Sequence, residues 1–424
     1  MIEHPYWWDT VADPPLDQPP PLPARADVAV IGAGYTGLSA ARQLARQGAS
    51  VVVLERERIG WGASSRNGGQ VLTGLKLDAA TLVAREGEWR ARERFERSLE
   101  SIAFLERLIA DEAIACDYGR SGHLQAAAKP AHFRAFRDEQ ALLARLFNHK
   151  VELVPAADQR SEIGSGVYHG LMVDERSGAL NPARYANGLA AAAVRAGATL
   201  VDRAAVRALA GQNGRWTVTT DRGDLGAGDV LVATNGYTGP ATPWLQRRLV
   251  PIGSYVIATA PLAPADAAAL LPRRRMAFDS RHFLHYFRVT ADRRLLFGGR
   301  AEFSRPSAAA TRRAAAILRR DLTRVFPSLD GVAIEYAWSG NVAMTRDQMP
   351  HAGKMEGAWF AAGYCGHGVA MATHLGALVA RRIGGDATAH PLIDDRVPAI
   401  PLYRGTPWFL PFVGAYYRAQ DWLQ

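Results

Sequence analysis

Three glycines near the start of the chain have the spacing of a turn that binds a phosphate group. Gly32, Gly34 and Gly37 form G-x-G-x-x-G between the apolar run DVAVI and an amphipathic stretch. The first glycine permits a tight turn, the second admits a pyrophosphate, and the third lets helix and strand pack closely. Glu55 ends the next apolar run, where a carboxylate can accept hydrogen bonds from ribose hydroxyls. We predict a dinucleotide site formed by Gly32, Ala33, Gly34, Tyr35, Thr36, Gly37, Glu55 and Arg56.

A second stretch rich in glycine follows at once. ERERIGWGASSRNGGQ places bare backbone amides beside side-chain donors, a combination that can follow a pyrophosphate and reach a flavin ring. A flexible surface linker is the alternative, but arginine and asparagine among the glycines favour a binding loop. We therefore expect FAD, bound in part by Gly62, Ala63, Ser64, Arg66, Asn67, Gly68, Gly69 and Gln70.

A third glycine-rich turn, GYCGHGV, again lies between an apolar run and a long helical pattern. A helix N-terminus here could stabilise negative charge on the N1/O2 edge of a reduced flavin. His367 taken alone could equally be a structural histidine. We expect cofactor contacts from this turn and from the strand ends that return to the first sheet: Gly363, Gly366, His367, Gly368, Val369, Val206, Ala233, Thr234 and Asn235.

The elements that carry these motifs alternate between strand and helix patterns. DVAVIG, the helix after it and VVVLE form a parallel βαβ unit, and DVLVATNG returns to the same sheet. Helical periodicity dominates residues 78–148, whereas residues 249–335 alternate strands with one basic helix. We predict an α/β fold in which a Rossmann-like FAD-binding domain is interleaved with a substrate domain, built on a mixed or antiparallel sheet with helices.

The expected boundaries follow from these patterns. Residues 1–25 are a proline-rich arm, and residues 386–424 are a C-terminal segment. The FAD-binding domain is expected from residues 26–80, 150–248 and 336–385, and the substrate domain from the helical segment 81–149 and from 249–335.

Composition narrows the class of protein. The 424 residues are 48% hydrophobic, enough for large cores, but the apolar stretches are too short to span a membrane. The N-terminus lacks the pattern of a secretory signal, so we expect a cytoplasmic protein. Cys116 and Cys365 fit neither a disulfide framework nor zinc-ligand spacing, and no metal is expected.

Charge and the C-terminal end bear on partners. The net charge of +9 comes mostly from arginines spread along helices, so no nucleic acid is expected. The aromatic end WFLPFVGAYYRAQDWL predicts a packing helix, with peripheral membrane contact as the alternative. None of these patterns sets an oligomeric state.

Taken together, the motifs resemble the D-amino-acid-oxidase-like flavoprotein superfamily, and most closely its gamma-glutamylputrescine oxidase-like branch. The matching stretches, in order, are YWWDT, DVAVIGAGYTGLSAA, GWGASSRNGGQ, HYFRVTADRRLLFGGR, VFPSLDGVAIEYAWSGNVAMTRDQMPHAG and GYCGHGVAMATHLGALVA. The resemblance implies FAD, oxidation of a C–N bond to an imine, and Gly340 beside the flavin.

Two departures from related enzymes matter. Sarcosine oxidases of the superfamily link their flavin through a cysteine, at a place that corresponds here to Gly340 and Asn341. We therefore expect noncovalent FAD, with Cys365 as a packing residue. Their oxygen-activating lysine corresponds to Leu296, which leaves other cations as candidates to assist O2 reduction near flavin N5: Arg66, His367 and Arg300.

The resulting hypothesis is an amine oxidase. A small-molecule amine would transfer hydride to flavin N5, the imine would hydrolyse to an aldehyde or oxo-acid, and O2 would become hydrogen peroxide. No catalytic base is evident, and hydride transfer depends more on positioning. Strand alternation should turn about half of the candidate pocket residues outward; the candidates are Tyr255, His285, Tyr286, Arg288, Arg300 and Trp338.

The substrate and the electron acceptor stay open at this point. The nearest branch favours a polyamine derivative, but amino acids, N-methyl amino acids and simple amines also fit. The rival functions are a dehydrogenase that passes electrons to a quinone or carrier, a flavin-dependent tRNA-modifying protein, and a flavin-binding protein without turnover.

Overall fold

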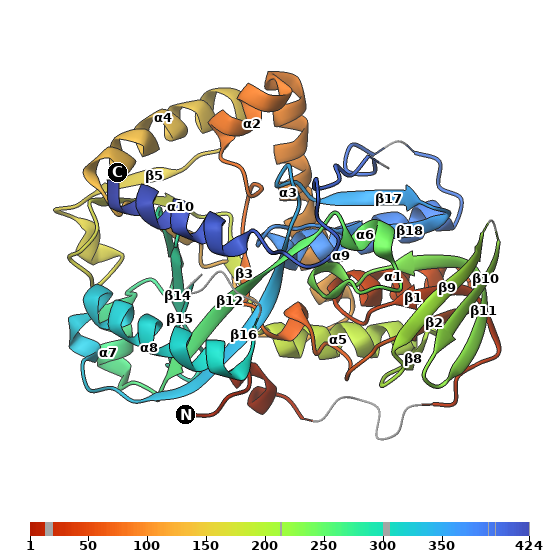
Figure 1. Ribbon diagram of the computed structural model, residues 1–424. Coiled ribbons are helices and arrows are strands. Elements are labelled where there is room, and N and C mark those ends of the chain that lie inside the picture. The colour runs from red at the N-terminus through yellow and green to blue at the C-terminus, as the bar shows by residue number, and fades with distance from the viewer. Residues whose placement is uncertain (13–19, 213, 300–305, 389, 395, 424) are drawn as a thin grey trace.

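The computed structural model describes residues 1–12, 20–212, 214–299, 306–388, 390–394 and 396–423. The described strands form two eight-stranded sheets and a small two-stranded one. In Figure 1 the sheet that contains β1 lies on the right with helices α1, α5 and α9, and the other lies on the left beside α7 and α8. We call these the first and the second sheet.

The first sheet has a parallel centre. Its order is β17-β18-β11-β1-β2-β8, and an antiparallel pair, β9 and β10, extends from β11. Ile31 at the end of β1 pairs with Leu54 of β2 and Val232 of β11, so three strands end at one edge. The strands are β1 (Arg25–Ile31), β2 (Val51–Leu54), β8 (Thr199–Val201), β9 (Val206–Gln212), β10 (Arg215–Thr220), β11 (Gly223–Val232), β17 (His351–Met355) and β18 (Ala358–Ala362).

Helices α1 (Tyr35–Arg46), α5 (Pro182–Arg195) and α9 (Gly368–Ile383) contribute to the largest apolar core beside this sheet. A Cβ on Gly37 would lie 1.9 Å from the carbonyl oxygen of Gly32. A Cβ on Gly376 would lie 2.2 Å from the carbonyl oxygen of Thr36. The backbone of α1 is therefore in close contact with the β1 turn on one side and with α9 on the other.

The second sheet is mixed. Its order is β16-β12-β15-β14-β13-β4-β6-β5, and all neighbours are antiparallel except β13 and β4. The strands are β4 (His123–Ala126), β5 (Glu152–Pro155), β6 (Gly170–Asp174), β12 (Val250–Thr259), β13 (Met276–Asp279), β14 (His285–Val289), β15 (Leu295–Gly299) and β16 (Ile334–Met344). Its outer face packs on α7 (Pro264–Leu270) and α8 (Ala308–Val325).

The remaining elements complete the two halves of the molecule. The helices are α2 (Ala79–Glu86), α3 (Glu88–Asp111), α4 (Pro130–Phe147), α6 (Pro243–Gln246) and α10 (Leu410–Leu423). The two-stranded sheet pairs β3 (Gln70–Val71) with β7 (Gly178–Ala179). Short 3-10 turns are η1 (Tyr6–Thr10), η2 (Ala63–Ser65), η3 (Gln159–Ser161), η4 (Asn235–Tyr237) and η5 (Pro327–Leu329). Across the described residues, no helix has both the length and the apolarity needed to cross a bilayer.

The mixed α/β fold expected from the sequence is confirmed, but several strands join a different sheet from the one their residue ranges suggested. β5 and β6 lie within the range 150–248, yet both belong to the second sheet. β4 is a strand in the segment 81–149 that was expected to be helical, and it joins the second sheet with the rest of the substrate-domain range. Most of β16 falls in the range 336–385, but it pairs with β12. The reason is that sheet membership depends on pairing between distant segments, such as β4 with β13, which a local apolar pattern does not encode.

Alternation along β14 separates two kinds of side chain. Phe287 and Tyr255 of β12 belong to the outer core against α8, and His285 contacts Asp321 of that helix at 3.4 Å. Tyr286 and Arg288 point to the opposite face, where they meet the loop that contains Gly68 and Gly69. Only the inner-facing pair can therefore reach a site between the two sheets.

His285 is expected to make part of the stability depend on pH. Burial lowers the pKa of His285, but Asp279 and Asp321 raise it more, to about 8 against the usual 6.5. The stabilisation is then fully present below pH 6.5 and is lost as the pH rises through 8. We expect His285→Gln to cost on the order of 1–2 kcal/mol of unfolding free energy at pH 6 and much less at pH 9.

Urea unfolding of both proteins at the two pH values measures this difference. His169→Gln, at an exposed histidine, is the matched control and should change little at either pH. An equal loss in His285→Gln at pH 6 and pH 9 would contradict the assignment.

Candidate cofactor and active site

A cavity of about 790 Å³ is lined by residues of both sheets and their loops. It extends from the strand ends of the first sheet to the inner face of the second. Most of the residues expected from the sequence line it: Gly32, Gly34, Tyr35, Thr36, Glu55, Arg56, Gly62, Ala63, Ser64, Arg66, Asn67, Gly68, Gln70, Val206, Ala233, Thr234, Asn235, Tyr286, Gly340, Gly366, His367, Gly368 and Val369.

The other expected residues are not on the cavity wall, for identifiable reasons. Arg300 lies outside the described residues. Tyr255 and His285 are on the outer face of the second sheet, and Trp338 is buried, with its indole N–H donating to the carbonyl of Arg66 at 2.8 Å. Four backbone positions lie just behind the wall and shape its turns: Ala33, Gly37, Gly69 and Gly363.

At one end, the glycine turn and β2 are joined by Glu55. Its carboxylate accepts hydrogen bonds from the backbone N–H of Ala33 at 2.8 Å and of Glu57 at 3.0 Å. Burial raises the pKa of Glu55, and these two N–H groups counteract part of that rise. Gly32 has a φ of +104°, a backbone conformation that glycine adopts without the steric strain that other residues would have. The carboxylate therefore lies at the end of β2, beside the turn, where a ribose of a dinucleotide would be placed.

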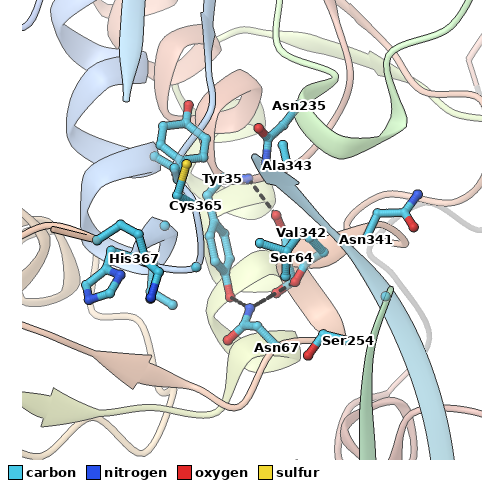
Figure 2. A pocket seen from close by; sticks show the side chains of 18 of the residues that line it. Tyr35, Ser64, Asn67, Asn235, Ser254, Asn341, Val342, Ala343, Cys365 and His367 are labelled. Carbon is cyan, nitrogen blue, oxygen red and sulfur yellow. Dashed lines mark hydrogen bonds between the residues drawn. The ribbon is translucent and has the colours of Figure 1, made fainter. Parts of the chain in front are cut away.

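The loop after β2 is held by its own side chains. Ser64 accepts a hydrogen bond from the backbone N–H of Tyr35 at the start of α1, at 3.0 Å. Asn67 donates to the carbonyl of Ala63 at 2.9 Å and accepts from the N–H of Gly69 at 2.7 Å. These bonds, drawn in part in Figure 2, place the loop along the first turn of α1.

Arg288 fastens the same loop to the second sheet. Its Nη1 donates to the carbonyls of Leu180 at 2.8 Å and Gly69 at 3.1 Å. Burial lowers the pKa of Arg288 to about 10, so it stays charged at neutral pH. We read it as a residue that fixes the loop, because its hydrogen bonds go to backbone carbonyls.

The start of α9 closes another side of the cavity. Tyr364 and Thr36 share a hydrogen bond of 2.6 Å between their hydroxyls, and the N–H of Gly363 donates to Asn235 at 2.9 Å. His367 is the N-cap residue of α9. Cys365 is buried, with its sulfur 3.1 Å from the carbonyl oxygen of Gly363, and burial raises the pKa of the thiol. These contacts agree with the packing role expected for the cysteine.

Asn341 is a cavity residue that the sequence reasoning did not select. Figure 2 shows it across the cavity from His367, with Tyr35 and Asn67 between them. Its amide nitrogen donates to the carbonyl of Gly236 at 3.0 Å, whereas its Oδ1 is buried and has no hydrogen-bond partner in the described part of the chain. A buried acceptor of this kind can take a hydrogen bond from a bound group or from water in the cavity. Its position next to Gly340 was the only signal in the sequence.

These features fit FAD. The N-termini of α1 and α9 both border the cavity, so unpaired helix N–H groups can face negative charge. Glycines leave room where side chains already crowd the wall: a Cβ would lie 3.1 Å from the Tyr286 ring at Gly68 and 3.3 Å from the Tyr237 ring at Gly62. Glu55, the loop 62–70, Asn341 and the turn before α9 are the groups that would hold the cofactor.

The inner face of the second sheet forms the far end of the cavity. Strand register places Met172, Gln125, Phe278 and Tyr286 in one row across four neighbouring strands. The Tyr286 hydroxyl lies 3.1 Å from Ser254 Oγ. Gln125 and Phe278 could not be selected from the sequence, because only the pairing of β4 with β13 brings them together.

Carboxylates gather at this far end. Although burial raises the pKa of Asp174, hydrogen bonds from His149 and Thr73 and the nearby His123 hold it at about 2, so the group is ionised. Arg281 lies 2.5 Å from Asp279 and His285 lies 3.2 Å from it, so both offset its charge. The carboxylates that line this end are Asp78, Glu139, Asp174 and Asp279, and the other ionisable residues there are Lys76, Arg281, His123, His149 and His282. With histidines counted as neutral, as in the chain's net charge of +9, this section has four carboxylates against one lysine and one arginine and is net negative.

The two-sheet fold, the glycine turn and the cavity suit a flavin-dependent oxidoreductase, and comparison with known proteins agrees. The model of the FAD dependent oxidoreductase family (DAO) matches residues 27–382, and the chain belongs to this family. The gamma-glutamylputrescine oxidoreductase of Escherichia coli is 34% identical over 403 residues, 94% of this chain and 93% of that protein.

Further relatives agree in length and in fold. A probable oxidoreductase OrdL of Haemophilus influenzae is 34% identical over 390 residues, which is 90% of this chain and 89% of that protein. Glycine oxidase from Geobacillus kaustophilus has a similar structure, with a TM-score of 0.74 and 20% identity, covering 89% of this chain and all of that one. The protein is thus an FAD-dependent oxidoreductase.

The contact of Gly37 with Gly32 gives a direct test of the cofactor site. We expect Gly37→Ala to weaken FAD binding by about tenfold or more, because a methyl group would force α1 away from the turn. Gly166→Ala is the control, since a Cβ there meets nothing within 4 Å. Titration of the apoprotein with FAD, followed by quenching of flavin fluorescence, measures the change. Equal affinities in the two variants would refute the role of the close contact.

Proposed function

We propose that the protein oxidises the C–N bond of an amine whose chain carries a second positive charge, a polyamine derivative, with O2 as electron acceptor. The observation that carries the proposal is the net negative far end of the cavity, which continues directly from the FAD-binding groups. An ammonium group would be attracted there. The relative named gamma-glutamylputrescine oxidoreductase supports a substrate of this kind.

Bound FAD would supply a hydride acceptor for the amine and a route for the electrons to O2. The chain's own residues would orient the substrate: Tyr286 and Ser254 present hydroxyls on the wall, and Phe278 and Met172 offer apolar surface for a methylene chain. Asp174 would hold the distal cation. The reaction then needs the reacting amine to be neutral and correctly placed, more than it needs a strong protein base.

Arg66 and His367 remain the proposed cations for O2 reduction, since both line the cavity from the flavin-binding turns. The oxygen-activating lysine of sarcosine oxidases corresponds here to Leu296, which is buried with Trp7 and Trp338. This apolar position favours a second candidate, a dehydrogenase that passes electrons to a quinone or carrier.

A peroxide assay separates the two candidates. The purified yellow protein is mixed with diamines, N-acylated diamines, monoamines and amino acids, first without oxygen and then in air. We expect bleaching of the flavin by chains with a second cation, followed in air by oxygen uptake and hydrogen peroxide. Bleaching without oxygen uptake would establish the dehydrogenase, and bleaching by amino acids alone would refute the substrate class. Heat-denatured protein should release FAD into solution, as noncovalent binding requires.

Substitution of Glu139 tests the negative charge at the far end of the cavity, because glutamine has nearly the same shape as glutamate. It lines the cavity and accepts a hydrogen bond from the N–H of Ala79 at 2.9 Å, which a glutamine carbonyl can also accept. We expect Glu139→Gln to raise the KM for a doubly charged amine by about three- to tenfold and to leave the KM for a monoamine unchanged. Asp138→Asn, an exposed neighbour on the same helix, is the control. If both variants behave alike, the cavity charge does not select the substrate.

A further inference from the structure

The N-terminal segment Tyr6–Thr10 precedes residues 27–382, which the family model covers, and it contacts the loop after β2. Trp7 is buried, and its indole N–H donates to the carbonyl of Asn67 at 2.9 Å. Trp8 donates through its indole N–H to Ser65 Oγ at 2.8 Å. The segment therefore bonds to two residues of the loop that follows the dinucleotide turn.

Trp8 also takes part in a stack of cations and rings. The guanidinium carbon of Arg58 lies 3.8 Å from the Trp8 ring centre, and that of Arg66 lies 4.7 Å from it. Arg66 is also 4.3 Å from the ring of Trp61. Burial lowers the pKa of Arg66, and the faces of two indoles are favourable surroundings for its charge. Trp8 thus fixes the side chain of a cavity residue as well as the loop backbone.

The segment is itself anchored to both domains. Tyr6 donates its hydroxyl to Asp292 at 2.6 Å, next to the second sheet. Thr10 accepts hydrogen bonds from Asn181 at 2.8 Å and from Arg184 at 3.1 Å, at the start of α5. With fixed points on both sides, the two tryptophans can hold the loop in one position.

The geometry points to Trp7 and Trp8 as positioning residues of the cofactor site, which hold residues 60–70 in the form that binds FAD and place Arg66 beside it. A glycine-rich loop loses much conformational freedom when it is ordered, and that loss weakens cofactor binding unless the loop is held in advance. The N-terminal segment provides this preorganisation. The inference depends on the FAD site and not on the substrate proposed above.

The test measures FAD release from the holoenzyme. The recovery of free-FAD fluorescence after dilution gives the release rate, and the visible absorption spectrum reports the surroundings of the flavin. We expect Trp8→Ala to speed FAD release at least tenfold and to shift the spectrum. Trp89→Ala, at a tryptophan that is 71% exposed, is the matched control and should match the unaltered protein in both. Unchanged release and spectrum in Trp8→Ala would overturn the inference.

Conservative variants separate positioning from folding. Trp8→Phe keeps an aromatic face for the arginines but removes the indole N–H, and Ser65→Ala removes its partner. Each should speed FAD release by less than Trp8→Ala. Ser65→Ala also removes the hydrogen bond from the Ser65 hydroxyl to the carbonyl of Gly60 at 2.7 Å. The double variant should therefore release FAD no faster than Ser65→Ala alone, because the bond to Trp8 is already absent there. If Trp8→Ala fails to fold, these two variants decide: additive or absent effects on release would refute the role of this bond. Amine turnover is measured separately, so failure of the proposed function would leave FAD release unaffected.

Discussion

The close contact of helix α1 with two other backbone segments sets the rest of the site. Gly37 lies against the carbonyl of Gly32, and Gly376 lies against the carbonyl of Thr36. Because no side chain separates these segments, the N-terminus of α1 is fixed relative to both the β1 turn and α9. The hydrogen bond between Thr36 and Tyr364 then brings the start of α9 to the same cavity. Two helix N-termini can in this way act on one cofactor.

The net charge of the molecule differs in sign from the charge at the far end of the cavity. Several arginines are neutralised within the fold, as Arg42 is by Glu112 at 2.5 Å and Arg275 by Glu162 and Glu175 at 2.8 and 2.6 Å. The far end of the cavity instead carries an excess of carboxylates. The net charge of +9 is therefore a poor guide to what the cavity attracts. The local potential at the wall is the relevant quantity.

The sequence predicted those parts of the site that are formed by residues close together in the chain. The glycine turn, Glu55 and the loop 62–70 could be placed because each motif lies between a recognisable strand and helix, and most of their residues do line the cavity. His285 and Tyr286 could not be told apart, because alternation needs the sheet's orientation. The residues Gln125, Phe278 and Asn341 depend on strand pairing across distant segments. Local patterns carry no information about such pairing.

The order of strands has a consequence for how the protein is made. β1 lies at the centre of the first sheet, but its neighbour β11 comes from residues 223–232, and β18 beyond that from residues 358–362. During synthesis, the glycine turn emerges from the ribosome long before the strands and the helix that complete its surroundings. FAD can therefore meet a finished site only late in translation or after it. Until then, the apolar edge of β1 is exposed to chaperones and to other chains.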